Sequence, residues 1–466
     1  MRLHIRSVRR SLGGIALVTL AAAPVAAQSR PTLAQRLDSI AGSGVARQLV
    51  VGSVIAVVKG NDTLLFKAYG KADVEWNVPM HVDAMFEIGS IAKQFTAVAI
   101  LQLRDQGKLS LDDEITKWLT DFDTHGNKVT LRHLLNHTSG IHDFTETQEF
   151  PALVGNRAWP RDSAYALIKR YPFDFATGSA QLYSNSGFWL LGLVVEKASG
   201  LSYEDYIEKK IFEPLGMRRS TYCNSYENVE RRAHGYRTRN GQIMRAPTTM
   251  HTWGFAAGAL CSTAADMITW LTALHGGKVL SPASYTEMIT PGKLNEWATL
   301  RYGMGLGVYK DFNGLQLFEH GGVNAGFWTQ VNWYPESQTG IVVLTNSPGS
   351  LDPEEVAEAL AWELLLDGRR PAATAKPFTG DPAPLVGRYS GRGARGELTI
   401  EVTHGPQGPM VSANNSPPRP LIWLDGWTFR FQGIVLTFHR SGNSGPATEL
   451  GFNPAKGLYS LLKRQS

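Results

Sequence analysis

Strand patterns lie on both sides of a long helical region, and this order limits the folds that are open to the chain. Two apolar runs, Val54–Val58 and Leu64–Tyr69, flank a Lys-Gly-Asn-Asp turn, which is typical of a β-hairpin. Residues 131–275 are helical and loop-rich, strand patterns return over residues 305–345, and an amphipathic helix is expected over Pro353–Leu366. This order predicts an α+β domain whose sheet takes strands from both ends of the domain.

A segment rich in proline and alanine follows this domain. Residues 371–384 include Pro371, Pro377, Pro382 and Pro384, which predicts a linker. Beyond it, short alternating runs are separated by Gly, Asn and Pro, which is typical of a small antiparallel β domain. We therefore expect a main domain over residues 28–370 and a β domain over residues 385–466.

Residues 1–27 have the pattern of an export signal. Four arginines precede an apolar stretch from Leu12 to Ala23, and small residues precede Gln28, which suits cleavage by a signal peptidase. A membrane anchor is the alternative, but the stretch is shorter than the ~20 apolar residues that span a bilayer, and Pro24 interrupts it. We expect an exported protein, periplasmic or secreted, with no membrane span after cleavage.

The charge of the chain argues against a nucleic-acid partner. There are 46 basic and 41 acidic residues, which gives a net charge of +5. The predicted signal holds four of the basic residues and no acidic one, so the mature chain has 42 basic residues against 41 acidic ones. Nucleic-acid-binding proteins usually carry a clear basic excess, and none is left here.

The chain has two cysteines, Cys223 and Cys261, which are 38 positions apart. In an oxidising compartment two cysteines are a candidate disulfide. Two separate buried thiols are the alternative, and the sequence leaves both interpretations open.

A serine and a lysine, Ser90-x-x-Lys93, stand at the start of an apolar helix. A serine hydroxyl is a weak nucleophile until a neighbouring base takes its proton. Three positions apart, the two side chains fall on one helix face, and the helix N-terminus provides a positive field for a developing oxyanion. About one such pair is expected by chance in a chain of this length. The second copy, Ser460 to Lys463, lies in a strand-like run, so we take Ser90 as the candidate nucleophile and Lys93 as its base.

A Tyr-x-Asn sequence provides a second candidate element. Tyr183-x-Asn185 precedes a predicted helix, Gly187–Ala198. A phenol can relay a proton to a leaving group, and an amide can hold a substrate carbonyl or the lysine. Two further matches, residues 222–224 and 226–228, lie in an irregular polar stretch, so Tyr183 is favoured by its context.

The third element is His320-Gly321-Gly322-Val323, which leads into a predicted strand. Paired glycines allow a substrate backbone to approach a strand edge closely. The Val323 N–H is then a candidate oxyanion donor. The same His-Gly-Gly letters at residues 275–277 directly follow a helix, where glycines act as a C-terminal cap.

These three elements, in this order, resemble the serine β-lactamase and penicillin-binding-protein superfamily. The chain is most similar to its class C branch, which also contains esterases, D-aminopeptidases and D-Ala-D-Ala carboxypeptidases. The resemblance spans Leu33 to Leu366, and three further stretches share it: Val54–Gly60, Leu134–Gly140 and Ala257–Leu260. It implies an antiparallel sheet flanked by helices, with a helical subdomain. The C-terminal β domain is similar to the small lipocalin-like domains of some members.

Carried over to this sequence, the resemblance implies roles for individual residues. Ser90 would be the nucleophile, Lys93 the general base and Tyr183 the proton relay. Asn185 would position the reacting groups, and the N–H groups of Ser90 and Val323 would form the oxyanion hole.

One departure from the family pattern concerns the substrate. Many β-lactam-hydrolysing members have Lys-Thr-Gly where this chain has His320-Gly321-Gly322. A lysine that binds a substrate carboxylate is thus replaced by a histidine, which is mostly neutral near pH 7. We therefore expect a serine hydrolase that cleaves ester or D-amino-acid-type peptide bonds through an acyl-enzyme, with weak β-lactam hydrolysis and no cofactor.

Other functions were compared on the same residues. His133 and His137 have the spacing of zinc-protease ligands, but the catalytic Glu and a third ligand are missing, so no metal site is expected. No Gly-x-Ser-x-Gly occurs, which argues against an α/β-hydrolase. A penicillin-binding sensor or wall-associated protein that deacylates slowly would have the same site residues and is the alternative function. The expected partner is a small ester or a short peptide, with a cell-wall peptide as one candidate; the sequence predicts no oligomeric state.

Overall fold

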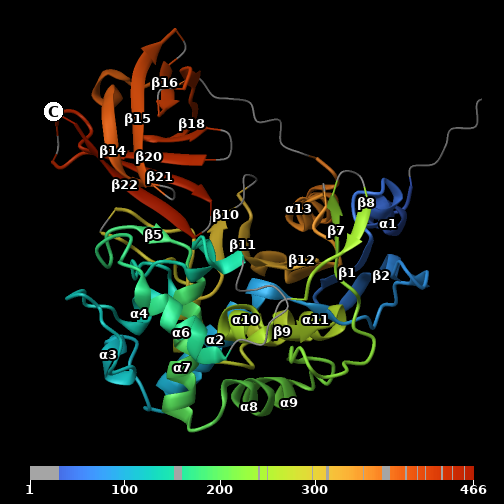
Figure 1. The fold of residues 1–466 in the computed structure, drawn as a ribbon. Coiled ribbons are helices and arrows are strands. Elements are labelled where there is room, and N and C mark those ends of the chain that lie inside the picture. Colours follow the sequence, from blue (N-terminus) through green and yellow to red (C-terminus); the bar gives the residue numbers. More distant parts are fainter. Residues whose placement is uncertain are drawn as a thin grey trace, which may run out of the picture. The chain divides into compact units, whose positions relative to one another are not determined.

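The computed structural model (Figure 1) describes residues 31–465 except for 152–159, 240–241, 249, 296, 311–313, 350, 370–377, 394–395, 407, 415, 432–433, 443 and 456. The predicted signal and the first part of the predicted linker lie outside the described residues. Within the described residues, no helix is long and apolar enough to cross a membrane.

The main sheet has seven antiparallel strands in the order β10-β11-β12-β13-β1-β2-β3. Its strands are β1 (Gly52–Lys59), β2 (Asp62–Asp73), β3 (Val78–Pro79), β10 (Gly307–Lys310), β11 (Gln316–Asn324), β12 (Phe327–Tyr334) and β13 (Thr339–Thr345). β1 pairs with β2 on one side and with β13 on the other, from Ser53↔Thr345 to Lys59↔Thr339. The sheet therefore joins the N-terminal hairpin to the later strands, as the sequence predicted.

The interior strand β1 is buried on both faces because helices cover both sides of the sheet (Figure 1). Ile55 and Val57 belong to the core under α1 (Leu33–Ala46) and α13 (Pro353–Leu366). Side chains alternate along a strand, so Val54 and Ala56 point the other way and join the larger core of the helical region. This two-sided burial explains the unbroken apolar run in the sequence.

The helical region lies between the two groups of strands in the chain. Its helices are α2 (Ala92–Asp105), α3 (Ile115–Trp118), α4 (Leu131–Leu135), α6 (Arg161–Arg170), α7 (Asn185–Ser199), α8 (Tyr203–Ile207), α9 (Glu213–Leu215), α10 (His251–Gly258), α11 (Ala264–His275) and α12 (Pro282–Met288). Every residue of α2 from Ala92 to Leu101 is buried. The helix is buried on every side over these positions because other elements surround it.

The C-terminal residues form a nearly closed, antiparallel barrel-like domain, which confirms the predicted β domain (Figure 1). Its strands are β14 (Gly387–Gly393), β15 (Gly396–Gly405), β16 (Gly408–Ala413), β17 (Arg419–Pro420), β18 (Ile422–Asp425), β19 (Thr428–Phe431), β20 (Ile434–His439), β21 (Glu449–Ala455) and β22 (Leu458–Arg464). The barrel has its own core, with Tyr389, Phe429 and Leu462 among its buried side chains. β22 also pairs with β5 (Gln181–Leu182), the strand just before Tyr183.

Candidate active site

Ser90 lies in a 3-10 turn, Gly89–Ile91, that leads directly into α2. Residues three apart nearly eclipse one another in such a turn, and Lys93 Nζ lies 3.0 Å from Ser90 Oγ. Gly89 has a φ of +53°, a left-handed conformation that favours glycine. The structure thus brings the predicted pair together, at a helix start whose first turn is 3-10.

Lys93 is the most completely buried charged residue of the site, with no exposed surface. Its Nζ lies 2.8 Å from Asn185 Oδ1 and 2.8 Å from the Ala257 carbonyl oxygen, besides its contact with Ser90. Burial lowers the pKa of Lys93 from 10.5 to about 7, and the nearby Asp143 carboxylate opposes part of that change. A substantial fraction of Lys93 is therefore a neutral amine at neutral pH.

The Tyr183–Asn185 segment is held by the start of α7. Ser184 caps this helix by accepting a hydrogen bond from the Gly187 N–H, and Asn185 is its first residue. Tyr183 lies over Lys93, with Nζ 4.8 Å from the centre of the phenol ring. The centres of the His137 and Tyr183 rings lie 4.3 Å apart, so Tyr183 is packed in place.

His137 holds the backbone of the Tyr183–Asn185 segment through a hydrogen bond. Its Nδ1 accepts a hydrogen bond from the Ser184 N–H at 3.1 Å, and burial keeps its pKa well below the usual value. His133 instead caps α4 through Thr130. The two histidines that have zinc-ligand spacing in the sequence therefore hold separate backbone segments.

β11 passes directly beside the nucleophile. A Cβ on Gly322 would lie 1.9 Å from the Ile88 carbonyl oxygen, and a Cβ on Gly89 would lie 2.7 Å from the Val323 nitrogen. Side chains at either glycine would push the two segments apart. The close approach places the Val323 backbone nitrogen next to the peptide that precedes Ser90, where the sequence predicted an oxyanion donor.

His320 is almost buried, and both of its ring nitrogens have partners. Nδ1 lies 2.6 Å from the Gly321 carbonyl oxygen, and Nε2 lies 2.9 Å from the Tyr302 hydroxyl. A carbonyl oxygen can only accept, so a neutral ring with its proton on Nδ1 satisfies both contacts, with the Tyr302 hydroxyl donating to Nε2. His320 thus helps to hold β11 and does not reproduce a family lysine.

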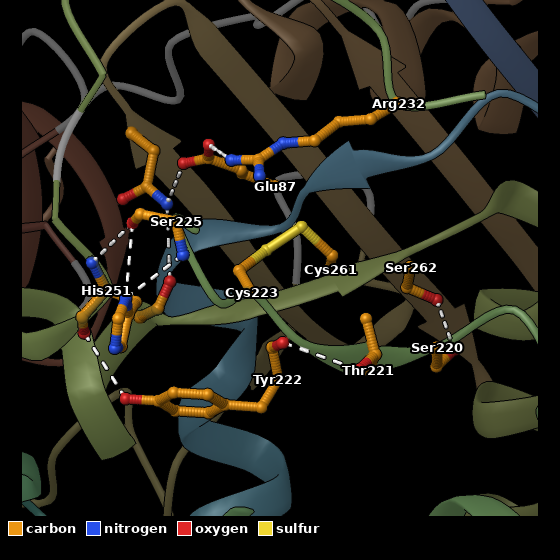
Figure 2. Close-up of a disulfide and its surroundings, with 12 residues drawn as sticks. Glu87, Ser220, Thr221, Tyr222, Cys223, Ser225, Arg232, His251, Cys261 and Ser262 are labelled. Carbon is orange, nitrogen blue, oxygen red and sulfur yellow. Dashed lines mark hydrogen bonds and ion pairs between the residues drawn. A yellow bond between two sulfur atoms is a disulfide. The ribbon is translucent and has the colours of Figure 1, made fainter. Parts of the chain in front are cut away.

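A disulfide supports the segment before Ser90. Cys223 and Cys261 are bonded, with their Cα atoms 5.2 Å apart, and Cys261 pairs with Glu87 across β9 (Leu260–Ser262) and β4 (Phe86–Glu87). Figure 2 shows the bond beside Glu87, with Arg232 reaching the Glu87 carboxylate. Of the two interpretations that the sequence left open, the structure has the bridge.

Glu87 also connects the two sides of the predicted oxyanion hole. Burial raises its pKa, while Arg232 and Asn324 lower it. Asn324, the residue after Val323, donates to Glu87 Oε2 at 3.0 Å and to the Gly258 carbonyl at 3.3 Å. A shallow hollow that opens to solvent, lined in part by Glu87, Gly258 and Asn324, adjoins this network.

Sequence reasoning assigned no role to Ala257, although its stretch was singled out. In α10, Phe255 has φ +37° and ψ −128°, which breaks the helix. The carbonyl of Ala256 then accepts from the Thr96 hydroxyl at 2.7 Å, and that of Ala257 accepts from Lys93. A backbone carbonyl has no sequence signature, so only the family resemblance of Ala257–Leu260 marked the place.

The comparisons with known proteins agree with this geometry. The Beta-lactamase family model matches residues 37–366. Penicillin-binding protein 4* of Bacillus subtilis (strain 168) is 28% identical over 330 residues, which cover 67% of this chain and 72% of the relative.

Two solved structures extend the similarity. A D-stereospecific amidohydrolase from Streptomyces sp. has a TM-score of 0.62 and 29% identity, covering 71% of this chain and 98% of its own. The octameric penicillin-binding protein homologue from Pyrococcus abyssi has a TM-score of 0.62 and 27% identity, covering 92% and 99%. Because the family model matches most of the chain, this protein belongs to the beta-lactamase family and is a serine hydrolase.

Proposed function

We propose that this serine hydrolase cleaves esters and short amides of D-amino acids through an acyl-enzyme on Ser90. The set of contacts around Lys93 Nζ carries the proposal. A neutral amine has two N–H groups and one lone pair, and the Asn185 and Ala257 oxygens can only accept. Both N–H groups are therefore used, and the lone pair faces the Ser90 hydroxyl.

In the acylation step Lys93 takes the Ser90 proton while Ser90 Oγ bonds to the substrate carbonyl carbon. The carbonyl electrons move to its oxygen, which the backbone N–H groups of Ser90 and Val323 stabilise. When the carbonyl re-forms, the bond to the leaving group breaks, and the proton passes from Lys93 through Tyr183 to the leaving oxygen or nitrogen. Water then attacks the acyl-enzyme by the same route and releases the acid.

Two observations support the substrate class. The similar Streptomyces enzyme is named as a D-stereospecific amidohydrolase. His320, whose two ring nitrogens are already bonded, offers no fixed cation for the carboxylate of a β-lactam. We infer that β-lactam hydrolysis is weak.

The test compares the protein, from residue 28 onward, with its Ser90→Ala variant. Substrates are a p-nitrophenyl ester, D- and L-amino acid amides, a D-Ala-D-Ala peptide and a chromogenic cephalosporin, with intact-protein mass read alongside. We expect turnover of the ester and the D-amide to be lost in the variant, by ~10⁴-fold or more. Ser460→Ala, in the second Ser-x-x-Lys copy, is the matched control and should keep full activity.

Either of two results would change the proposal. Activity that survives Ser90→Ala would show that the nucleophile is another residue. A stable adduct on Ser90 without turnover would favour a slowly deacylating penicillin-binding sensor, a function that the similarity to a penicillin-binding protein also supports.

We further propose that the protein is exported, on the basis of the signal pattern in residues 1–27. The test is the N-terminal sequence of the protein recovered outside the cytoplasm. It should begin at or near Gln28, whereas protein retained in the cytoplasm with an intact N-terminus would contradict export.

A further inference from the structure

The orientation of the Asn185 side-chain amide decides whether Lys93 Nζ faces a hydrogen-bond acceptor or a donor. Its Oδ1 lies 2.8 Å from Lys93 Nζ, so Lys93 has an acceptor for one N–H. Rotation by 180° would exchange the oxygen for an NH₂ group, which donates. The lysine lone pair could then be drawn to that NH₂ group instead of the Ser90 proton.

The other end of the amide is fixed by a buried carboxylate. Asn185 Nδ2 lies 3.0 Å from Asp143 Oδ2 and 3.1 Å from Thr145 Oγ1. Asp143 is only 5% exposed and stands at the cap of the short 3-10 segment Phe144–Glu146. Both contacts of Nδ2 are therefore made to protein groups, one of them a buried carboxylate.

Asp143 can hold this arrangement because each of its oxygens is an acceptor. Oδ2 accepts from the backbone N–H of Asn185 at 3.0 Å as well as from Nδ2. Oδ1 accepts from the Thr145 N–H at 3.0 Å and from its hydroxyl at 2.9 Å. Four donors meet one carboxylate. An amide in its place would offer one acceptor and one donor, so a donor would face a donor on one side.

We propose that Asp143 is a positioning residue that fixes the Asn185 amide with its oxygen toward Lys93. The proposal rests on the proposed function, in which Lys93 is the base. Asp143 touches neither substrate nor Ser90 in this scheme, and it acts through Asn185. Thr145 is its partner, since the Thr145 hydroxyl accepts from Asn185 while donating to Asp143.

Asp143 also contributes its charge. The titratable groups packed around Lys93 are Tyr183, His137, His320 and Asp143. His137 is neutral at pH 7 because burial lowers its pKa, and a neutral His320 ring satisfies both of its contacts. The Asp143 carboxylate raises the pKa of Lys93. Removing that charge should therefore lower the pKa of the lysine further.

The experiment measures kcat, KM and the pH profile of kcat/KM for Asp143→Asn on a p-nitrophenyl ester. We expect kcat to fall ~100-fold, as misplacement of a catalytic group commonly costs, with a smaller change in KM. The acid limb of the profile should move to lower pH. Asp121→Asn is the matched control, because Asp121 bonds Lys169 and Tyr165 at the surface and should leave all three quantities unchanged.

A double-mutant cycle with Asn185→Ala tests whether Asp143 acts through Asn185. If it does, Asp143→Asn adds little to the loss already caused by Asn185→Ala. Thr145→Val keeps the charge and removes one contact of Nδ2, so it should lower kcat several-fold with an unmoved acid limb. If Asp143→Asn does not fold, as judged by circular dichroism and thermal melting, Thr145→Val replaces it in the double-mutant cycle with Asn185→Ala.

Three results would overturn the proposal. They are wild-type kinetics in Asp143→Asn, a lower rate with an unmoved acid limb, and fully additive losses in the cycle. Failure of the proposed function is distinguishable, because it would show as activity that survives Ser90→Ala, whatever the Asp143 variants do.

Discussion

Replacement of Lys93 by methionine should change the way in which stability depends on pH. Lys93 has a pKa of about 7 in the folded protein, against 10.5 as the ordinary value. Between these values the unfolded chain binds a proton that the folded protein does not bind. The free energy of unfolding therefore rises with pH across this window. The destabilisation of the folded state by protonated Lys93 is fully present below pH 7 and disappears above pH 10.5.

The size of the effect follows from the two pKa values. At about 1.4 kcal/mol per pKa unit, protonated Lys93 destabilises the folded state by about 5 kcal/mol below pH 7. Between pH 7 and pH 9 about 2 kcal/mol of that penalty should disappear. The methionine variant also loses the hydrogen bonds to Asn185 and Ala257, but that loss does not depend on the ionisation of Lys93.

The assay is urea denaturation of wild type and Lys93→Met at pH 7, 8 and 9. Between pH 7 and pH 9 the unfolding free energy of wild type should rise by about 2 kcal/mol relative to that of Lys93→Met. Lys169→Met, at the surface beside Asp121, is the matched control, and its difference from wild type should stay constant. A constant difference for Lys93→Met would refute the reasoning, because Lys93 would then be a charged group at pH 7 and no base.

Two further predictions concern the backbone around the site. Gly322→Ala should lower kcat ~100-fold or more, since its Cβ would meet the Ile88 carbonyl at 1.9 Å. Gly321→Ala is the control, because its Cβ would meet a glutamine side chain at 2.8 Å and no backbone atom at so short a distance. Equal activity in the two variants would contradict the close approach of β11 to the Ile88 carbonyl. Replacing Cys223 and Cys261 together by serine should lower the unfolding free energy by about 4 kcal/mol, from the loop entropy of a 38-residue separation. Urea denaturation measures this loss, and an unchanged midpoint would show that the bridge does not restrain the unfolded chain.

The sequence predicted the parts of the fold and site that depend on local pattern. Ser90 and Lys93 are three residues apart, so a helical turn alone brings them together. The sequence places Tyr183 and Asn185 before a predicted helix, Gly187–Ala198, and the structure has that helix, although it already begins at Asn185. A sheet with strands from both ends of the domain was expected from the order of the strand patterns, but the specific pairing of β1 with β13 was not predicted.

The remaining contacts of the site depend on long-range packing. The Ala257 carbonyl reaches Lys93 because the backbone turns at Phe255, and no residue type predicts that turn. Asp143 lies in a loop and becomes significant only when α7 places Asn185 beside it. Asp143 could have been suspected because it lies three residues after Leu134–Gly140, a stretch that shares the family resemblance.

His320 shows how a family difference can be built into the fold. If this position needed only to be neutral, any small residue beside Gly321 would serve. Instead the ring is bonded at both nitrogens, to the Gly321 carbonyl and to Tyr302, and Tyr302 contacts His137, which also packs against Tyr183. A lysine at position 320 would lose the aromatic contacts and place a second cation near Lys93, where it would lower the pKa of the base further. The histidine therefore replaces a carboxylate-binding cation by a packed support of the Tyr183 side of the site, which fits a hydrolase of esters and amides.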